Sequence, residues 1–105
     1  MMGQPVELDG YVIEDDRLRV TKDLSQDFDL SFDRACQELL KSPSMDLVID
    51  LGEVGYINST YIGIIAATFF QAQDRKKTLT VHAAGSVIQV LRAAGFEGFI
   101  QLEEK

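Results

Sequence analysis

The sequence is poor in the residues that build disulfides, thiolate clusters and imidazole sites. Its 105 residues include a single cysteine, Cys36, and a single histidine, His82. One cysteine excludes an internal disulfide and a thiolate zinc cluster within the chain. Together with the lack of a recognisable signal peptide, this cysteine usage favours a reducing, cytoplasmic setting.

Long apolar runs and positive charge are also scarce. The longest apolar stretch covers residues 61–70, well short of the roughly 18 residues that a membrane span needs. Ten Lys and Arg stand against 17 Asp and Glu, which gives a formal net charge of −7. A field of that sign disfavours nucleic acid and anionic membrane surfaces. We therefore expect no nucleic-acid partner and no insertion into a membrane.

The rest of the composition is that of one globular domain. Hydrophobic residues make up 46% of the chain and charged residues 26%, which argues against disorder. A chain of this length has room for one core, so residues 1–105 are expected to form a single domain.

The N-terminal part predicts short strands. Residues 1–9 are the least defined segment, either a loose terminus or a short edge strand. The apolar runs 11–13 and 18–20 flank an acidic turn at 14–16, which predicts a β-hairpin.

A helix is predicted over residues 25–42, because apolar residues recur there at helical spacing. Pro43 follows directly and ends such a helix. The apolar face places Cys36 among packing residues, so we expect a buried and unreactive thiol. The members of this face are Phe28, Phe32, Cys36, Leu39 and Leu40.

The second half alternates strands and helices. An apolar run predicts a strand buried on both faces at 46–51, followed by an apolar helix at 59–74. A strand at 78–83, a helix at 86–94 and a short strand at 99–102 complete the order β-β-α-β-α-β-α-β. Right-handed crossovers make the later strands parallel. The sequence therefore predicts an α/β fold with a mixed β-sheet covered by α-helices.

The turn after the 46–51 strand is the place where a site is expected. In open α/β sheets, sites gather beyond the carboxyl ends of the strands and beside helix N-termini. Asn58, Ser59 and Thr60 begin the second helix, and a side-chain oxygen there can accept a first-turn N–H. A phosphate on such a hydroxyl is compatible with the helix N-terminus. The alternative is that these residues only cap the helix.

Catalysis has little support. His82 is the only possible imidazole base, and no nucleophile-elbow sequence is present. Gly52, Gly55 and Gly63 do not form a phosphate-cradling loop with a following lysine. We therefore expect a non-enzymatic protein without a cofactor or a metal site, in which His82 is an ordinary strand residue.

Two stretches of the sequence resemble the STAS domain, the fold of anti-sigma factor antagonists. The first runs Asp46-Leu-Val-Ile-Asp-Leu and then Ile57-Asn-Ser-Thr-Tyr-Ile-Gly63. In the family, a strand ending in Asp-Leu precedes an Asp-Ser-Ser/Thr-Gly-Leu-Gly turn that opens a helix. The second, residues 79–96, is similar to the family's next strand and its helix ending in a Gly-hydrophobic pair. The resemblance covers residues 46–102 well and residues 11–40 more loosely.

The resemblance implies a phosphorylated hydroxyl in this turn. By position it is Thr60, with Ser59 as the second choice. Asn58 stands where the family has aspartate, and Tyr61 stands where it has glycine. The tyrosine ring either shields the Thr60 hydroxyl or anchors a partner. The resemblance implies that the partner-binding residues are Asn58, Ser59, Thr60 and Tyr61, together with Asp23 and Ser25 from the loop before the first helix.

The resemblance implies a bacterial regulator of transcription that acts by signal transduction. Its partner is an anti-sigma factor or a serine/threonine protein kinase, and a PP2C-type phosphatase is a further implied partner. One alternative is a STAS scaffold in a signalling assembly that is never phosphorylated. Another is a STAS subunit of an ABC-type lipid transport complex. The sequence does not predict the oligomeric state.

Overall fold

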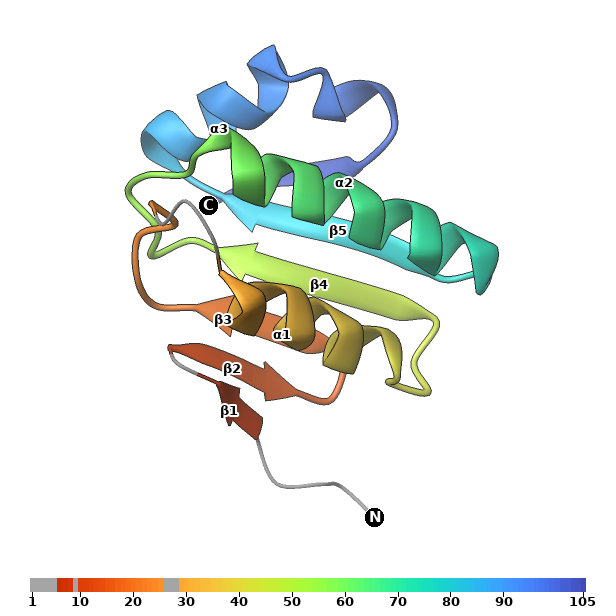
Figure 1. Ribbon diagram of the computed structural model, residues 1–105. Helices are drawn as coiled ribbons and strands as arrows, with labels where there is room; N and C mark the ends of the chain where they lie inside the picture. Colours follow the sequence, from red (N-terminus) through yellow and green to blue (C-terminus); the bar gives the residue numbers. More distant parts are fainter. Residues whose placement is uncertain (1–5, 9, 26–28) are drawn as a thin grey trace.

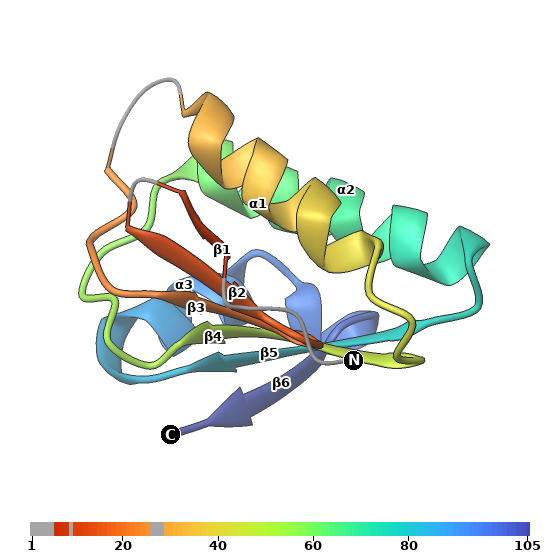
Figure 2. The same ribbon diagram turned by 90° about the horizontal axis from the view of Figure 1, so that it is seen from below.

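The structure, a computed structural model, describes residues 6–8, 10–25 and 29–105. Six strands form one sheet in the order β1-β2-β3-β4-β5-β6. Helices α1 and α2 lie side by side on one face of this sheet, and α3 lies beyond α2 toward β6 (Figures 1 and 2). The elements are β1 Val6–Leu8, β2 Tyr11–Glu14, β3 Arg17–Val20, α1 Leu30–Leu40, β4 Asp46–Leu51, α2 Ser59–Asp74, β5 Thr78–Ala83, α3 Gly85–Ala93, the 3₁₀-helix η1 Phe96–Gly98 and β6 Gln101–Glu104.

The sheet is mixed, as the sequence predicts. The pairs β1–β2 and β2–β3 are antiparallel. From β3 onward the pairs β3–β4, β4–β5 and β5–β6 are parallel, and each crossover passes through a helix. The predicted N-terminal hairpin and the α/β fold class are confirmed, and within the predicted 1–9 segment residues 6–8 form the strand β1.

The periodicity of the sequence gave the bounds of β4, α2 and β5 correctly. The strands β4 and β5 lie inside the sheet, and α2 covers one face of it (Figure 1). In such segments the pattern of apolar residues follows burial closely. In β4 the side chains of Leu47, Ile49 and Leu51 are fully buried in the core. Alternate residues of a strand point to opposite faces, so Val48 and Asp50 point to the face that α1 and α2 leave open. The predicted burial on both faces holds only in part, because on the open face Asp50 is 6% exposed whereas Val48 is half-buried and Asp46 is exposed.

Helix α1 begins five residues later than predicted. The side chain of Asp29 accepts a hydrogen bond from the Phe32 backbone N–H at 3.0 Å, so Asp29 is the N-cap and Ser25 lies before the helix. A capping aspartate stops helical backbone at its own position. Phe28, predicted on the apolar face, lies outside the described residues, whereas Phe32 and Cys36 are buried as expected.

The C-terminal region also differs in its bounds. Gly95 has φ +86°, the left-handed conformation expected after α3. The chain then forms η1 before it extends, so β6 begins at Gln101 rather than at residue 99. Among the described residues, no helix is long and apolar enough to cross a bilayer.

A core substitution tests the assignment of β4 to the centre of the fold. Ile49→Ala removes a fully buried side chain and is expected to lower the free energy of unfolding by about 2–5 kcal/mol. Val90→Ala is the control, because Val90 is 38% exposed on α3, and its effect is expected within about 0.5 kcal/mol. Urea unfolding followed by circular dichroism measures both. Equal effects of the two substitutions would contradict the fold.

Candidate functional site

The start of α2 is capped by Asn58. Its side-chain oxygen accepts hydrogen bonds from the backbone N–H groups of Thr60 at 3.0 Å and Tyr61 at 3.4 Å. Its own backbone is extended, with φ −104° and ψ 175°. Ser59 and Thr60 are both exposed on the first turn. Asn58 therefore satisfies the free N–H groups, and the hydroxyls of Ser59 and Thr60 are not needed for that role.

Two loops meet beside this helix start. Leu24 donates its backbone N–H to the Tyr56 carbonyl at 2.8 Å, and Asn58 donates to the Leu24 carbonyl at 3.0 Å. The Asp23 carboxylate accepts from the Gly55 N–H at 2.8 Å. The two backbone bonds of Leu24 form an isolated parallel bridge between Leu24 and Ile57. The loop that carries Asp23 and Ser25 thus lies against the loop that leads into α2.

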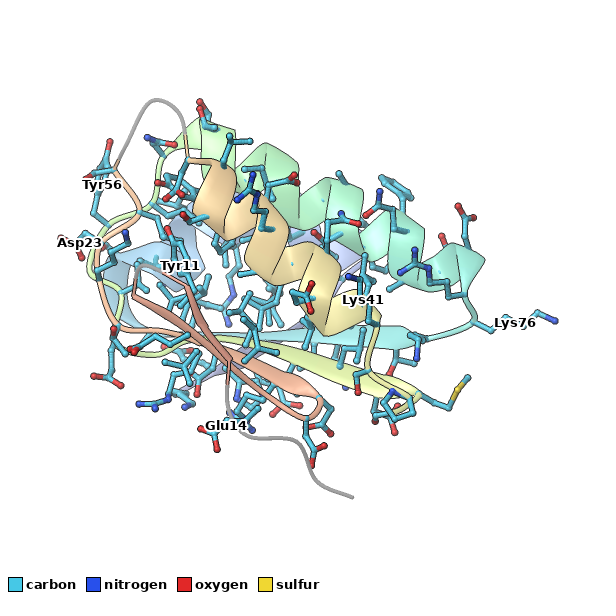
Figure 3. The ribbon with its side chains drawn as sticks, turned by 60° about the horizontal axis from the view of Figure 1, so that its bottom comes forward. Tyr11, Glu14, Asp23, Lys41, Tyr56 and Lys76 are labelled. Carbon is cyan, nitrogen blue, oxygen red and sulfur yellow. The ribbon has the colours of Figure 1, made fainter. Side chains whose placement is uncertain are left out.

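The resulting surface contains a residue that the sequence reasoning missed. Tyr56 is 53% exposed and projects from the same end of the molecule as Asp23 (Figure 3). The feature of the sequence that could have indicated Tyr56 is a single aromatic residue within the turn, between Gly55 and Ile57. We call this region the α2-start surface and define it by the residues Asp23, Ser25, Tyr56, Asn58, Ser59 and Thr60.

Tyr61 is not part of this surface. Its side chain is fully buried, and its hydroxyl donates to the Asp29 carboxylate at 2.8 Å. Its ring packs edge-on against Phe32, with 5.2 Å between centroids. Both expectations for Tyr61, an exposed anchor for a partner and a shield over the Thr60 hydroxyl, are therefore wrong. The ring points inward because Tyr61, the third residue of α2, lies on the face of the helix that packs against the core.

Asp29 is the centre of a buried polar cluster. Its carboxylate, 6% exposed, also accepts from the Tyr11 hydroxyl and from the Phe32 N–H. The Lys22 ammonium lies 4.8 Å from the centroid of the Tyr11 ring. These groups come from β2, the 21–25 loop, α1 and α2, so one carboxylate joins four segments behind the α2-start surface.

The electrostatics of the cluster follow from these contacts. Burial acts to raise the pKa of Asp29, but hydrogen bonds from Tyr11, Tyr61 and the Phe32 N–H, with the charge of Lys22, outweigh it and hold that pKa below its usual range. Burial and the neighbouring carboxylate raise the pKa of Tyr11 far above that of a free phenol. Asp29 is therefore ionised and Tyr11 is neutral at pH 7.

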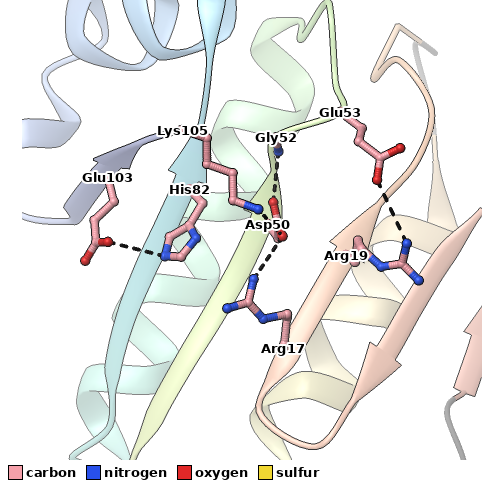
Figure 4. Close-up of polar contacts among 8 residues, drawn as sticks. All are labelled: Arg17, Arg19, Asp50, Gly52, Glu53, His82, Glu103 and Lys105. Carbon is pink, nitrogen blue, oxygen red and sulfur yellow. Dashed lines mark hydrogen bonds and ion pairs between the residues drawn. The ribbon is translucent and has the colours of Figure 1, made fainter.

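A second buried carboxylate, that of Asp50, holds the start of the 52–58 loop. On the open face of the sheet, Asp50 accepts from Arg17 at 2.9 Å and from Lys105 at 2.7 Å, and it also accepts from the Gly52 N–H at 2.9 Å (Figure 4). Burial alone would raise the pKa of Asp50, but the bonds from Lys105 and Gly52 and the charge of Arg17 lower it. The loop thus leaves β4 from a fixed position.

The two residues considered for catalysis lie away from the α2-start surface. His82 is on the open face in β5, where its Nε2 is 3.6 Å from the Glu103 carboxylate. Cys36 is buried as predicted, and burial raises the pKa of its thiol to about 12. Within residues 6–8, 10–25 and 29–105, no three His, Cys, Asp or Glu side chains gather in a way that could hold a metal ion.

The cap can be tested by two substitutions at one position. Asn58→Ala leaves the first-turn N–H groups of α2 without their acceptor and is expected to lower the free energy of unfolding by about 1 kcal/mol. Asn58→Asp keeps an acceptor and adds a charge that the helix N-terminus favours, so its stability is expected to equal or exceed that of the original chain. Chemical denaturation compares the three proteins. A neutral Asn58→Ala would show that the bonds to Thr60 and Tyr61 do not stabilise the helix.

The buried carboxylates predict sensitivity to acid. Asp29 and Asp50 have folded-state pKa values below that of an unfolded aspartate, about 4. Their stabilising contribution is therefore present above pH 4 and is lost as the pH falls through their folded-state pKa values. The free energy of unfolding is therefore expected to decrease as the pH falls below about 4. The double variant Asp29→Asn/Asp50→Asn should have a shallower dependence in urea titrations, and an unchanged slope would contradict the assignment.

Comparison with known proteins identifies the family. The family model described as "Mlab, STAS domain" matches residues 12–103, which include most of β2, the strands β3 to β5, the helices α1 to α3 and most of β6. No curated protein matches the chain significantly. The match covers most of the chain and agrees with the observed order of strands and helices. The chain therefore belongs to the STAS domain family.

Proposed function

We propose that this STAS domain is an anti-sigma factor antagonist-like regulator that binds its partner through the α2-start surface. The partner is an anti-sigma factor or a serine/threonine protein kinase, and phosphorylation of Thr60 releases it. The observation that carries the proposal is the position of Thr60: its side chain is exposed on the first turn of α2, while Asn58 caps that turn. The hydroxyl is open to a kinase and is not required by the helix.

The chemistry of a phosphate at this position supports a switch. A phosphorylated threonine carries nearly two negative charges at pH 7, and a helix N-terminus tolerates them. A partner seated on the same surface meets new repulsion and a cost of removing water from the dianion. Asp23 is exposed in the adjoining 21–25 loop, so a phosphate on Thr60 adds to a carboxylate already present on the α2-start surface. The domain stays folded while the interface is lost.

The buried contacts behind the surface support a preformed interface. Tyr61, which follows Thr60 directly, is bonded to Asp29, and the 21–25 loop is bonded to the 52–58 loop. Ordering loops on binding costs free energy, and the bonds on this surface are already made in the free domain. Asn58, Ser59, Asp23 and Ser25 are the proposed contacts around Thr60, with Tyr56 as an aromatic anchor.

The proposed regulator binds its partner without catalysing a reaction, and it is located in the cytoplasm. The Cys36 thiol is buried and protonated, and His82 is on the other face of the sheet from the helices, so neither supports a nucleophile at the α2-start surface. The proposed partners are cytoplasmic proteins. A PP2C-type phosphatase would restore binding by removing the phosphate.

The test compares Thr60→Glu with a control substitution on α3. Thr60→Glu is expected to keep the thermal midpoint and to weaken partner capture from native lysate at least tenfold, which corresponds to about 1.4 kcal/mol. Gln89→Glu is the control, because it adds the same single charge at an exposed position of α3 outside the α2-start surface, and it is expected to leave partner capture unchanged. Bound proteins are identified by mass spectrometry, and the intact mass of the protein from its native cell reports phosphate on Thr60.

The outcomes separate the alternatives. Capture of an anti-sigma factor or kinase by the original chain, but not by Thr60→Glu, supports the switch. Equal capture by both, with no phosphate on Thr60, indicates a constitutive STAS scaffold. Capture of an ABC-type ATPase subunit indicates a transporter-associated STAS protein and overturns the proposed partner.

A further inference from the structure

Four phenylalanines form a cluster at the opposite end of α2. Phe69 and Phe70 come from the helix, Phe96 from η1, and Phe99 from the connection to β6. Phe69 and Phe99 pack edge-on with 5.2 Å between ring centroids. Phe70 and Phe99 are stacked at 6.0 Å with an interplanar angle of 8°. This outer pair is 56% and 40% exposed, so two stacked aromatic faces remain open at the surface.

A cleft of about 300 Å³ adjoins these rings, between the second half of α2 and the starts of β5 and β6. Such a volume is at the lower limit of small-ligand sites and fits one large side chain. The apolar lining consists of Phe69, Phe99 and Leu79, and the polar lining of Gln73, Lys77, Thr78 and Gln101. Amide and hydroxyl groups at the rim can pair with a peptide backbone.

Positive charge follows α2 directly at this end. Arg75 and Lys76 are exposed, and in the described part of the chain neither has a carboxylate within 4.0 Å. Lys77 donates to the carbonyl oxygens of Ser42 and Ser44, both at 2.6 Å, which orient its charge without neutralising it. In a chain of net charge −7, this is a local reversal of sign.

Lys76 also has an unusual backbone conformation. Its φ is +59°, the left-handed region that favours glycine. It occupies the position just after a helix end, where Lys76 N–H bonds to the Gln73 carbonyl and Lys77 N–H to the Ala72 carbonyl, both at 2.9 Å. Glycine is the usual residue here, because a side chain costs free energy. A backbone outlier of this kind is a ground for a functional hypothesis.

We propose that this region, the α2-end surface formed by Phe70, Phe99, the cleft, Arg75 and Lys76, binds an acidic segment of a partner protein. An aromatic or aliphatic side chain of that segment enters the cleft beside Phe99, and its carboxylates pair with Arg75 and Lys76. An anionic membrane is disfavoured by the net charge of −7.

The two surfaces are independent. Helix α2 has 16 residues and is therefore about 24 Å long. Lys76 lies at the opposite end of the molecule from Asp23 and Tyr56 (Figure 3). A partner at the α2-start surface thus leaves the α2-end surface free, and the inference goes beyond the proposed function without depending on it.

The probe is a synthetic peptide, Glu-Asp-Glu-Phe-Glu-Asp-Leu-Glu. A matched control peptide has Gln in place of every Glu and Asn in place of every Asp. Titrated into the ¹⁵N-labelled full chain, the acidic peptide is expected to shift amides of residues 69–79 and 99–101, and the amide peptide is expected to bind about tenfold more weakly. Lys76→Gly should weaken binding of the acidic peptide several-fold, while it raises the thermal midpoint of the protein. Phe99→Ala should weaken binding of the same peptide about tenfold. Thr60→Glu is the control and should leave binding unchanged.

Several results would overturn the proposal. These are the absence of shifts, shifts confined to the α2-start surface, equal affinity for the two peptides, or undiminished binding by Lys76→Gly. Cosedimentation with phosphatidylglycerol vesicles in place of peptide binding would assign the surface to a membrane. A dimer in sedimentation equilibrium that Phe70→Ser dissociates would assign it to a second copy of the chain.

Discussion

The buried carboxylate of Asp29 is the interaction on which the arrangement of the helices over the sheet depends. A charge that is 6% exposed is tolerated only when its oxygens are fully hydrogen-bonded. Tyr11, Tyr61 and the Phe32 N–H supply those bonds. They come from β2, α2 and α1, so satisfying one charge fixes both helices against the sheet. Removing one donor leaves part of the charge unpaired, which costs more than the bond itself contributes.

This constraint explains how a STAS domain can carry tyrosine where the family has glycine. The Tyr61 hydroxyl is a donor to Asp29, and its ring fills core space beside Phe32. Thr60, one residue earlier, consequently faces solvent. Asp50 has a comparable role on the open face, where it holds the first residue of the 52–58 loop through Gly52. Two buried carboxylates, one on each face, thus hold the loops that present the start of α2.

Helix α2 then has two different ends. Its start is neutral to acidic and is bordered by two loops that are bonded to each other. Its end is basic and aromatic, with an open cleft. The middle of the helix packs through Ile65, Thr68 and Ala72, which are buried. The two surfaces proposed for partner binding therefore differ in their chemistry although they lie on one helix.

Local patterns in the sequence determined the central elements and the position of the cap. Unbroken apolar periodicity defined β4, α2 and β5, and Asn58 was correctly expected at a helix start, because these features depend on neighbours within a few residues. The tertiary structure alone decided the direction of Tyr61, the pairing of Asp23 with Gly55 and the grouping of Phe70 with Phe99. Each of these contacts joins residues 29 or more positions apart. Periodicity tells which face of an element is buried, but the residue that lies opposite is set by how the helices and loops pack on the sheet.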